Sequence, residues 1–194
     1  MAEHAFITDL LNTAGTDKGK WYGGLYEVLF RPIRLDIRCV VEIGIGTLSP
    51  DRPSNMCGYA AAHYRPGGSL RAWRDYFPNA HIYGFDIAPD TQFLEPRITT
   101  YLCDSTRDEA RRIASEMSPK PDLIIDDGLH TAEAQRATIR NFFPSLRSSG
   151  IYIVEDVFPT DVDTIIEELR QLAPKSAAFV DRSWGSRVAI VSRK

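Results

Sequence analysis

The run Pro121-Asp122-Leu123-Ile124-Ile125 is followed at once by Asp126-Asp127-Gly128-Leu129-His130, and a second apolar run, Gly150–Val154, is followed by Glu155-Asp156. Near-continuous apolar runs of this length are typical of central strands in a parallel sheet that is covered on both faces. In such sheets, ligands bind at the carboxyl ends of the strands. We therefore expect the acids and the histidine that follow the two strands to share one crevice.

The length and composition of the chain suit a single domain. With 194 residues, the chain is long enough for a substantial core, and we expect one domain over residues 1–194. The net charge of −3 gives no reason to expect nucleic acid or an anionic membrane as a partner. No apolar run is long enough to span a bilayer, and no secretory signal is evident at the amino terminus. The three cysteines lack metal or redox spacing, so we expect a cytoplasmic location.

Strand-like and helix-like segments alternate after about residue 35, which predicts an α/β layered fold. Besides the two runs quoted above, strands are expected at 39–43, 81–85 and 98–102, and helices at 69–76, 107–117 and 132–143. Apolar residues at helical spacing predict a further helix over 162–172, with Thr160 or Asp161 as its N-cap. The strand-like pieces 177–180 and 187–191 are expected to form a hairpin through Trp184-Gly185-Ser186. The prediction is a seven-stranded mixed sheet that ends in an antiparallel hairpin.

Glu42-Ile43-Gly44-Ile45-Gly46 follows the first strand. Its two glycines allow a tight turn and a close approach of the backbone to a ligand, although a Gly-x-Gly alone is weak evidence. The third glycine of the dinucleotide fingerprint is missing, because Thr47-Leu48-Ser49-Pro50 follows. This absence argues against a nicotinamide-dependent oxidoreductase.

Two single acids follow the next two strands. Asp86, in Gly84-Phe85-Asp86-Ile87, is placed either to accept hydrogen bonds from ribose hydroxyls or to cap the end of its strand. Asp104, in Cys103-Asp104-Ser105, is placed either to accept from an adenine amino group or to act as the N-cap of the next helix.

These features together resemble a known family. The Glu-x-Gly-x-Gly motif, the acid after the second strand, Asp104-Ser105 and the terminal hairpin resemble class I S-adenosylmethionine-dependent methyltransferases. With Gly15-Thr16-Asp17-Lys18-Gly19, residues 67–78, residues 126–130 and residues 153–156, the chain is similar to the metal-dependent sugar O-methyltransferases of the macrocin and mycinamicin type. The same segments also resemble the related methyltransferase-like protein of cephamycin biosynthesis. The extra amino-terminal domain of longer members is not expected here, and Leu129 stands where a serine is common.

The resemblance implies a fold, a cofactor, a metal and a set of site residues. The implied fold is a Rossmann-like doubly wound sheet, with residues 1–35 as a helical cap. The implied cofactor is S-adenosylmethionine, and the implied metal is Mg²⁺ or another hard divalent cation. The implied acceptor is a small-molecule glycoside. The resemblance is also compatible with a homo-oligomer. The implied metal ligands are Asp127, Glu155 and Asp156, and the catalytic residues are His130 and Asp127. The cofactor-binding residues are Thr16, Asp17, Lys18, Glu42, Gly44, Gly46, Ser69, Asp86, Asp104, Ser105 and Asp126.

The chemistry of methyl transfer explains why such residues are needed. An aliphatic hydroxyl is a poor nucleophile until its proton is removed. A carboxylate-bound Mg²⁺ lowers the pKa of the hydroxyl, and a histidine takes the proton. We expect His130 to open the helix that follows it, where the positive end of the helix dipole favours the neutral imidazole that a base requires.

The segment Thr47–Gly67 is long for a connection, and its Tyr59, Tyr64 and Pro66-Gly67-Gly68 predict a lid over the cofactor or acceptor, with a solvated insertion as the alternative. Two other functions remain open. One is a catechol O-methyltransferase, because enzymes of that class use comparable carboxylates. The other is a non-catalytic partner subunit that binds S-adenosylmethionine.

Overall fold

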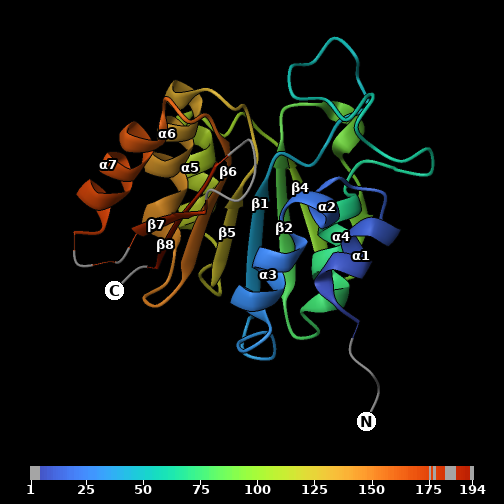
Figure 1. The fold of residues 1–194 in the computed structure, drawn as a ribbon, viewed down its shortest axis with the longest axis horizontal. Coiled ribbons are helices and arrows are strands. Elements are labelled where there is room, and N and C mark those ends of the chain that lie inside the picture. Colours follow the sequence, from blue (N-terminus) through green and yellow to red (C-terminus); the bar gives the residue numbers. More distant parts are fainter. Residues whose placement is uncertain (1–4, 175, 177, 182–186, 193–194) are drawn as a thin grey trace.

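The computed structural model describes residues 5–174, 176, 178–181 and 187–192. The described residues form one eight-stranded sheet with the order β3-β4-β2-β1-β5-β6-β8-β7 (Figure 1). Its strands are β1 (Cys39–Ile43), β2 (His81–Asp86), β3 (Leu94–Glu95), β4 (Ile98–Leu102), β5 (Leu123–Asp126), β6 (Ile151–Val157), β7 (Ala178–Asp181) and β8 (Arg187–Ser192). The five strands β4, β2, β1, β5 and β6 are parallel, whereas β3, β8 and β7 pair antiparallel.

The predicted mixed α/β sheet with a terminal antiparallel pair is confirmed, but the strand count differs by one. The additional strand, β3, has two residues and pairs with Ile98 and Thr99 at the edge of the sheet. A segment this short has no periodicity that a sequence pattern could reveal. The predicted connection at Trp184-Gly185-Ser186 and the predicted strand start at residue 177 lie outside the described residues.

Helices lie on both faces of the sheet (Figure 1). They are α1 (Ile7–Thr13), α2 (Lys18–Trp21), α3 (Gly23–Phe30), α4 (Gly68–Tyr76), α5 (Asp108–Ser115), α6 (Ala132–Phe142) and α7 (Val162–Leu172), with short 3₁₀ turns at Pro89–Thr91 and Phe143–Ser145. The predicted helices are all present, with ends that differ by no more than two residues, and the helix predicted over 162–172 matches at both ends. Asp161 occupies the N-cap position of α7, but its side chain makes no capping hydrogen bond, so that part of the capping prediction is wrong.

The alternation of side chains along each strand builds two cores. Val41 and Ile43 of β1 point into a core shared with α5, α6 and α7. Val40, the residue before Val41, belongs to the other core, which contains residues of α1, α3 and α4. The rings of Tyr26, Phe30, Trp73 and Phe77 pack against one another in this second core, some stacked and some edge to face. The sheet is therefore covered on both faces, as its near-continuous apolar strands predict.

The carboxyl ends of the parallel strands lie together at one edge of the sheet, at the top of Figure 1. The loop of residues 47–67 contains no helix or strand and extends beyond this edge. Among the described residues, no helix is both long and apolar enough to cross a membrane.

Candidate active site

A pocket of about 890 Å³ opens at the carboxyl edge of the sheet and extends under the loop of residues 47–67. Nine predicted site residues line it: Asp17, Gly44, Gly46, Asp86, Asp104, Ser105, Asp127, His130 and Asp156. Six others are buried and do not line it: Thr16, Lys18, Glu42, Ser69, Asp126 and Glu155. The predicted residues therefore divide into a pocket wall and a layer of polar groups behind it.

The glycines after β1 shape the floor of this pocket. Gly44 and Gly46 have φ angles of 82° and 87°, in the left-handed region that favours glycine. A Cβ atom at Gly44 would lie 1.9 Å from the backbone oxygen of Asp127. The turn after β1 thus needs glycine because the backbone after β5 approaches it so closely.

The acids at the ends of β2 and β4 line the pocket and also hold its backbone. Asp86 accepts hydrogen bonds from the backbone N–H groups of Ile45 (2.7 Å) and Ala88 (2.9 Å), and burial raises its pKa. Asp104 accepts from the N–H and the hydroxyl of Thr106, at 2.9 and 2.7 Å. Asp104 is not the N-cap of α5, because that position belongs to Arg107. Both carboxylates can still accept from a ligand in the pocket, because each oxygen has two lone pairs.

Asp127, His130 and Asp156 form a half-buried group whose ligand atoms all lie within 4.8 Å of one another. His130 Nε2 is 3.1 Å from Asp127 Oδ1 and 3.8 Å from Asp156 Oδ2. Asp156 lies where the register of β6 against β8 shifts between Val154 and Val157, and its φ of 50° is unusual for a residue with a side chain. Such bulges turn a side chain away from the direction that strand alternation gives it. The two carboxylates suit a hard divalent cation such as Mg²⁺ or Mn²⁺, whereas an imidazole is a more usual ligand of zinc, copper, iron or nickel.

Glu155, the third predicted metal ligand, is fully buried beside a lysine. The Lys18 ammonium contacts the carboxylate of Glu155, lies 2.5 Å from Asp127 Oδ2 and lies 3.3 Å from Glu42 Oε1. Burial raises the pKa of Glu155 to about 7, against the lowering effect of Lys18. Burial also raises the pKa of Asp127, but Lys18 and His130 outweigh it and leave that pKa below its usual value. In this structure a lysine cation therefore links the end of β1 to the ends of β5 and β6.

The pKa of His130 shifts in the direction opposite to the one expected from the helix dipole. Burial lowers the pKa, but the hydrogen bond to Asp127 and the charges of Asp127 and Asp156 raise it above its usual value. The helix also begins later than expected, at Ala132, with the Thr131 hydroxyl accepting from Ala134 N–H at 3.3 Å. Two adjacent carboxylates outweigh a helix terminus at this distance, so the pKa of His130 in the metal-free protein is raised, whereas the helix dipole alone would lower it.

The remaining predicted residues lie behind the residues that line the pocket. Ser69 donates to Glu42 Oε2 at 2.8 Å, and Thr16 Oγ1 accepts from the backbone N–H of Lys18 at 3.2 Å. Asp126, beneath the Asp127 backbone, lies 3.5 Å from the Tyr152 hydroxyl, and burial raises its pKa to about 7.

Two tyrosines contribute to the site in a way that the sequence did not predict. The Tyr22 hydroxyl donates to Asp156, and the Tyr26 hydroxyl donates to Glu155. Their spacing from Lys18, four and eight residues, was the available signal, because it places all three on one helix face. The pocket also has exposed apolar side chains next to the acidic group: Trp21, Leu129 and Phe158.

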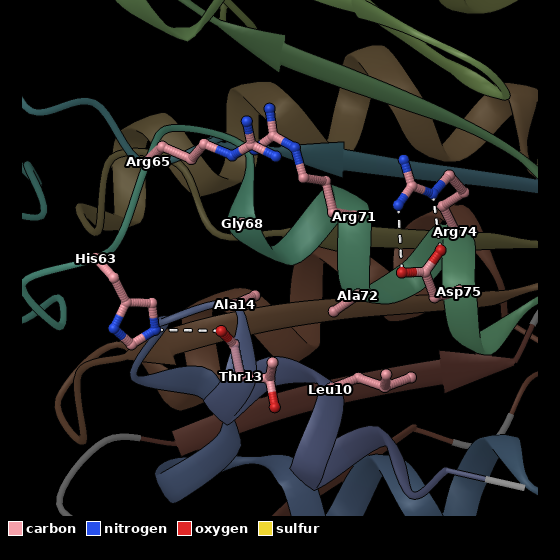
Figure 2. Close-up of a pocket in the computed structure, with 10 residues that line it drawn as sticks. All are labelled: Leu10, Thr13, Ala14, His63, Arg65, Gly68, Arg71, Ala72, Arg74 and Asp75. Atoms are coloured by element: carbon pink, nitrogen blue, oxygen red, sulfur yellow. Dashed lines mark hydrogen bonds and ion pairs between the residues drawn. The ribbon is translucent and has the colours of Figure 1, made fainter.

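Figure 2 shows a second cavity, of about 240 Å³, between α1 and α4. None of the predicted site residues lines it. Two arginines of α4 that face it, Arg71 and Arg74, are paired with Glu95, and the His63 ring contacts the backbone oxygen of Thr13 at 3.2 Å. The predicted chemistry therefore belongs to the larger pocket.

Comparison with known proteins supports a methyltransferase relationship. The chain is 37% identical over 142 residues to 8-demethyl-8-(2-methoxy-alpha-L-rhamnosyl)-tetracenomycin-C 3'-O-methyltransferase of Streptomyces olivaceus, covering 71% of this chain and 32% of that protein. It is 35% identical over 139 residues to mycinamicin VI 2''-O-methyltransferase of Micromonospora griseorubida, again covering 71% and 32%. The chain is a homologue of sugar O-methyltransferases. It spans about a third of the length of these relatives, and no family model matches it.

A solved structure agrees with this relationship over the whole chain. MycE methyltransferase from the mycinamycin biosynthetic pathway, in complex with Mg and SAH, superposes with a TM-score of 0.78 at 25% identity. The match covers 100% of this chain and 56% of MycE. This chain therefore has the class I methyltransferase fold that its sequence predicts.

Proposed function

We propose that this chain binds S-adenosylmethionine and a hard divalent cation, and that it transfers a methyl group to a hydroxyl of a glycoside. The observation that carries the proposal is the position of Asp127, His130 and Asp156 in the same pocket as Gly44, Gly46, Asp86 and Asp104. The names of the relatives support it, because they describe transfer to sugar hydroxyls, and MycE was solved with Mg and SAH. The catechol alternative has no such support.

The cofactor and the acceptor would meet between Asp86 and Asp104 on one side of the pocket and Asp127, His130 and Asp156 on the other. Asp86 and Asp104, at the ends of β2 and β4, would accept hydrogen bonds from the ribose and the adenine. When bound, the cation lowers the pKa of the acceptor hydroxyl. Asp127 and Asp156 would hold the cation, with Glu155 as a further ligand where its carboxylate turns from Lys18.

His130 would act as the general base. In the metal-free protein Nε2 donates to Asp127 and orients the ring. Once Asp127 holds the cation, a neutral Nε2 released from that contact would take the proton of the acceptor hydroxyl as the oxygen attacks the methyl carbon. The sulfonium sulfur keeps the electron pair of the breaking bond, so S-adenosylhomocysteine leaves uncharged at sulfur. Because nearby carboxylates raise the pKa of His130, we expect the rate to increase with pH across the neutral range.

The chain's three thiols are free, which fits the proposed cytoplasmic location.

The proposal is tested by mass spectrometry of methyl transfer across a panel of glycosides and catechols, with and without EDTA. We expect a glycoside to gain one methyl group only when a divalent cation is present. His130→Ala should lower the rate by roughly 10²–10⁴-fold, the usual contribution of a general base. His63→Ala, which removes an exposed histidine outside the pocket, is the matched control and should keep the rate. Full activity in EDTA would disprove the metal role, and transfer to catechols alone would disprove the acceptor class.

A further inference from the structure

Three donor side chains are arranged along one face of the α2–α3 segment. The backbone hydrogen bonds pass through the junction of the two helices: Tyr22 N–H donates to Lys18 O at 2.8 Å, and Tyr26 N–H donates to Tyr22 O at 2.9 Å. The i→i−4 hydrogen bonds therefore continue across Tyr22, although this residue caps both helices with a non-helical φ of −121°. Residues four apart on a helix lie above one another, so Lys18, Tyr22 and Tyr26 form a ladder of donors.

Each member of this donor ladder contacts an acid at the carboxyl end of β5 or β6. Lys18 contacts Asp127 and Glu155, Tyr22 donates to Asp156, and Tyr26 donates to Glu155. All three acids that the sequence suggests as metal ligands thus receive a hydrogen bond or an ion pair from one helical face. The ladder lies more than one hundred residues away in sequence from the acids that it contacts.

Burial makes the ladder rigid. Tyr26 and Glu155 are fully buried, and Lys18 and Tyr22 are nearly so. Glu42 Oε1 is buried without a hydrogen bond and relies on the charge of Lys18 at 3.3 Å. A buried polar group that loses its partner is costly, so these side chains have few alternative positions.

We propose that Lys18, Tyr22 and Tyr26 are positioning residues that orient the acids at the ends of β5 and β6, so that the affinity for a divalent cation depends on the docked α2–α3 segment. The inference rests on the proposed metal site. Groups that hydrogen-bond to metal ligands fix the orientation of those ligands, and their loss weakens metal binding by roughly 10- to 100-fold. Tyr22 gives the clearest test because it contacts Asp156, a member of the group that could hold the cation, and, unlike Lys18, carries no charge of its own.

The test measures Mn²⁺ binding to the full chain by electron paramagnetic resonance, without any acceptor or turnover. Tyr22→Phe removes only the hydroxyl, and we expect its dissociation constant for Mn²⁺ to rise by roughly 10- to 100-fold. Tyr101→Phe is the matched control, because Tyr101 stacks on Phe85 in the other core and does not line the pocket. The affinity for S-adenosylhomocysteine should be the same in all three proteins, which separates positioning from a general loss of structure.

The outcomes separate this inference from the function on which it rests. If the wild-type protein binds Mn²⁺ and Tyr22→Phe binds it equally well, the ladder does not position the ligands, whereas the metal site stands. If the wild-type protein binds no Mn²⁺ at millimolar concentration, the metal site itself fails and the inference fails with it. A Tyr22→Phe protein that loses Mn²⁺ and S-adenosylhomocysteine affinity alike would also overturn the inference in favour of a purely structural role.

Discussion

In the metal-free protein, the Lys18 ammonium balances the charge of the buried carboxylates of Glu42 and Glu155. Lys18→Met should therefore lower the melting temperature markedly in EDTA, because removing one partner of a buried ion pair costs about 3–5 kcal/mol. The loss should be smaller with Mg²⁺ present, since the added cation compensates part of the charge. Calorimetry measures both effects. Lys20→Met, at an exposed position two residues away, is the control, and an equal effect of the two substitutions would refute this role of Lys18.

Asp126 makes the stability depend on pH. Burial raises its pKa to about 7, whereas an aspartate in the unfolded chain has a pKa of about 3.9. Between these values the folded protein holds a proton that the unfolded chain has lost, so the free energy of unfolding falls as the pH rises. Asp126→Asn should therefore melt higher than the wild type at pH 8 and about equally at pH 4.

The comparison is made in EDTA, with Asp51→Asn in the exposed loop as the control. Glu155, whose pKa burial also raises to about 7, should preserve part of the pH dependence in the Asp126 variant. If Asp126→Asn and the wild type had the same melting temperature at pH 8, the Asp126 carboxylate would not destabilise the fold at that pH.

The loop of residues 47–67 is an element without helix or strand, held at a few points. Its Met56 N–H donates to Thr47 O at 2.9 Å, and the Tyr64 hydroxyl donates to the carbonyls of Ile45 and Gly46. Residues 52–57 and Tyr59 line the pocket, on both sides of the Met56 contact. This arrangement supports the lid that the sequence predicts, because a ligand in the pocket would contact the loop directly.

Hydrogen exchange tests the lid. Amides of residues 51–60 should exchange more slowly when S-adenosylhomocysteine and an acceptor are bound, whereas residues 31–37, which precede β1 at the opposite edge of the sheet, should be unaffected. Equal protection of residues 51–60 with and without ligands would make the segment a plain insertion.

At the scale of the whole molecule, the pocket spans the ends of β1, β2, β4, β5 and β6, so its ligand should stabilise the fold as a unit. S-adenosylmethionine at one hundred times its dissociation constant should add about 2.7 kcal/mol, which is several degrees in melting temperature for a chain of this length. NAD⁺ should not change the melting temperature. A thermal-shift titration decides the question, and stabilisation by NAD⁺ alone would exclude the methyltransferase assignment.

The relation between sequence and structure differs between the strands and the site. The strands β1, β2, β4, β5 and β6 could be predicted because each is an apolar run bounded by turn residues, and the acids after them follow from the parallel arrangement. The glycines at 44 and 46 were also predictable, since both turns require positive φ. The two-residue β3 was not, because pairing with β4 alone defines it.

The amino-acid sequence by itself determined the layered sheet and the edge at which the acids gather, because apolar periodicity and turn residues are local properties of the chain. Only the tertiary structure decided where each carboxylate points. Glu155 faces inward because Lys18, 137 residues earlier, lies beside it, and Asp156 turns toward Tyr22 through a bulge in β6. Orientation and charge at a buried site depend on partners that are distant in sequence and meet only when the α2–α3 segment packs on the sheet.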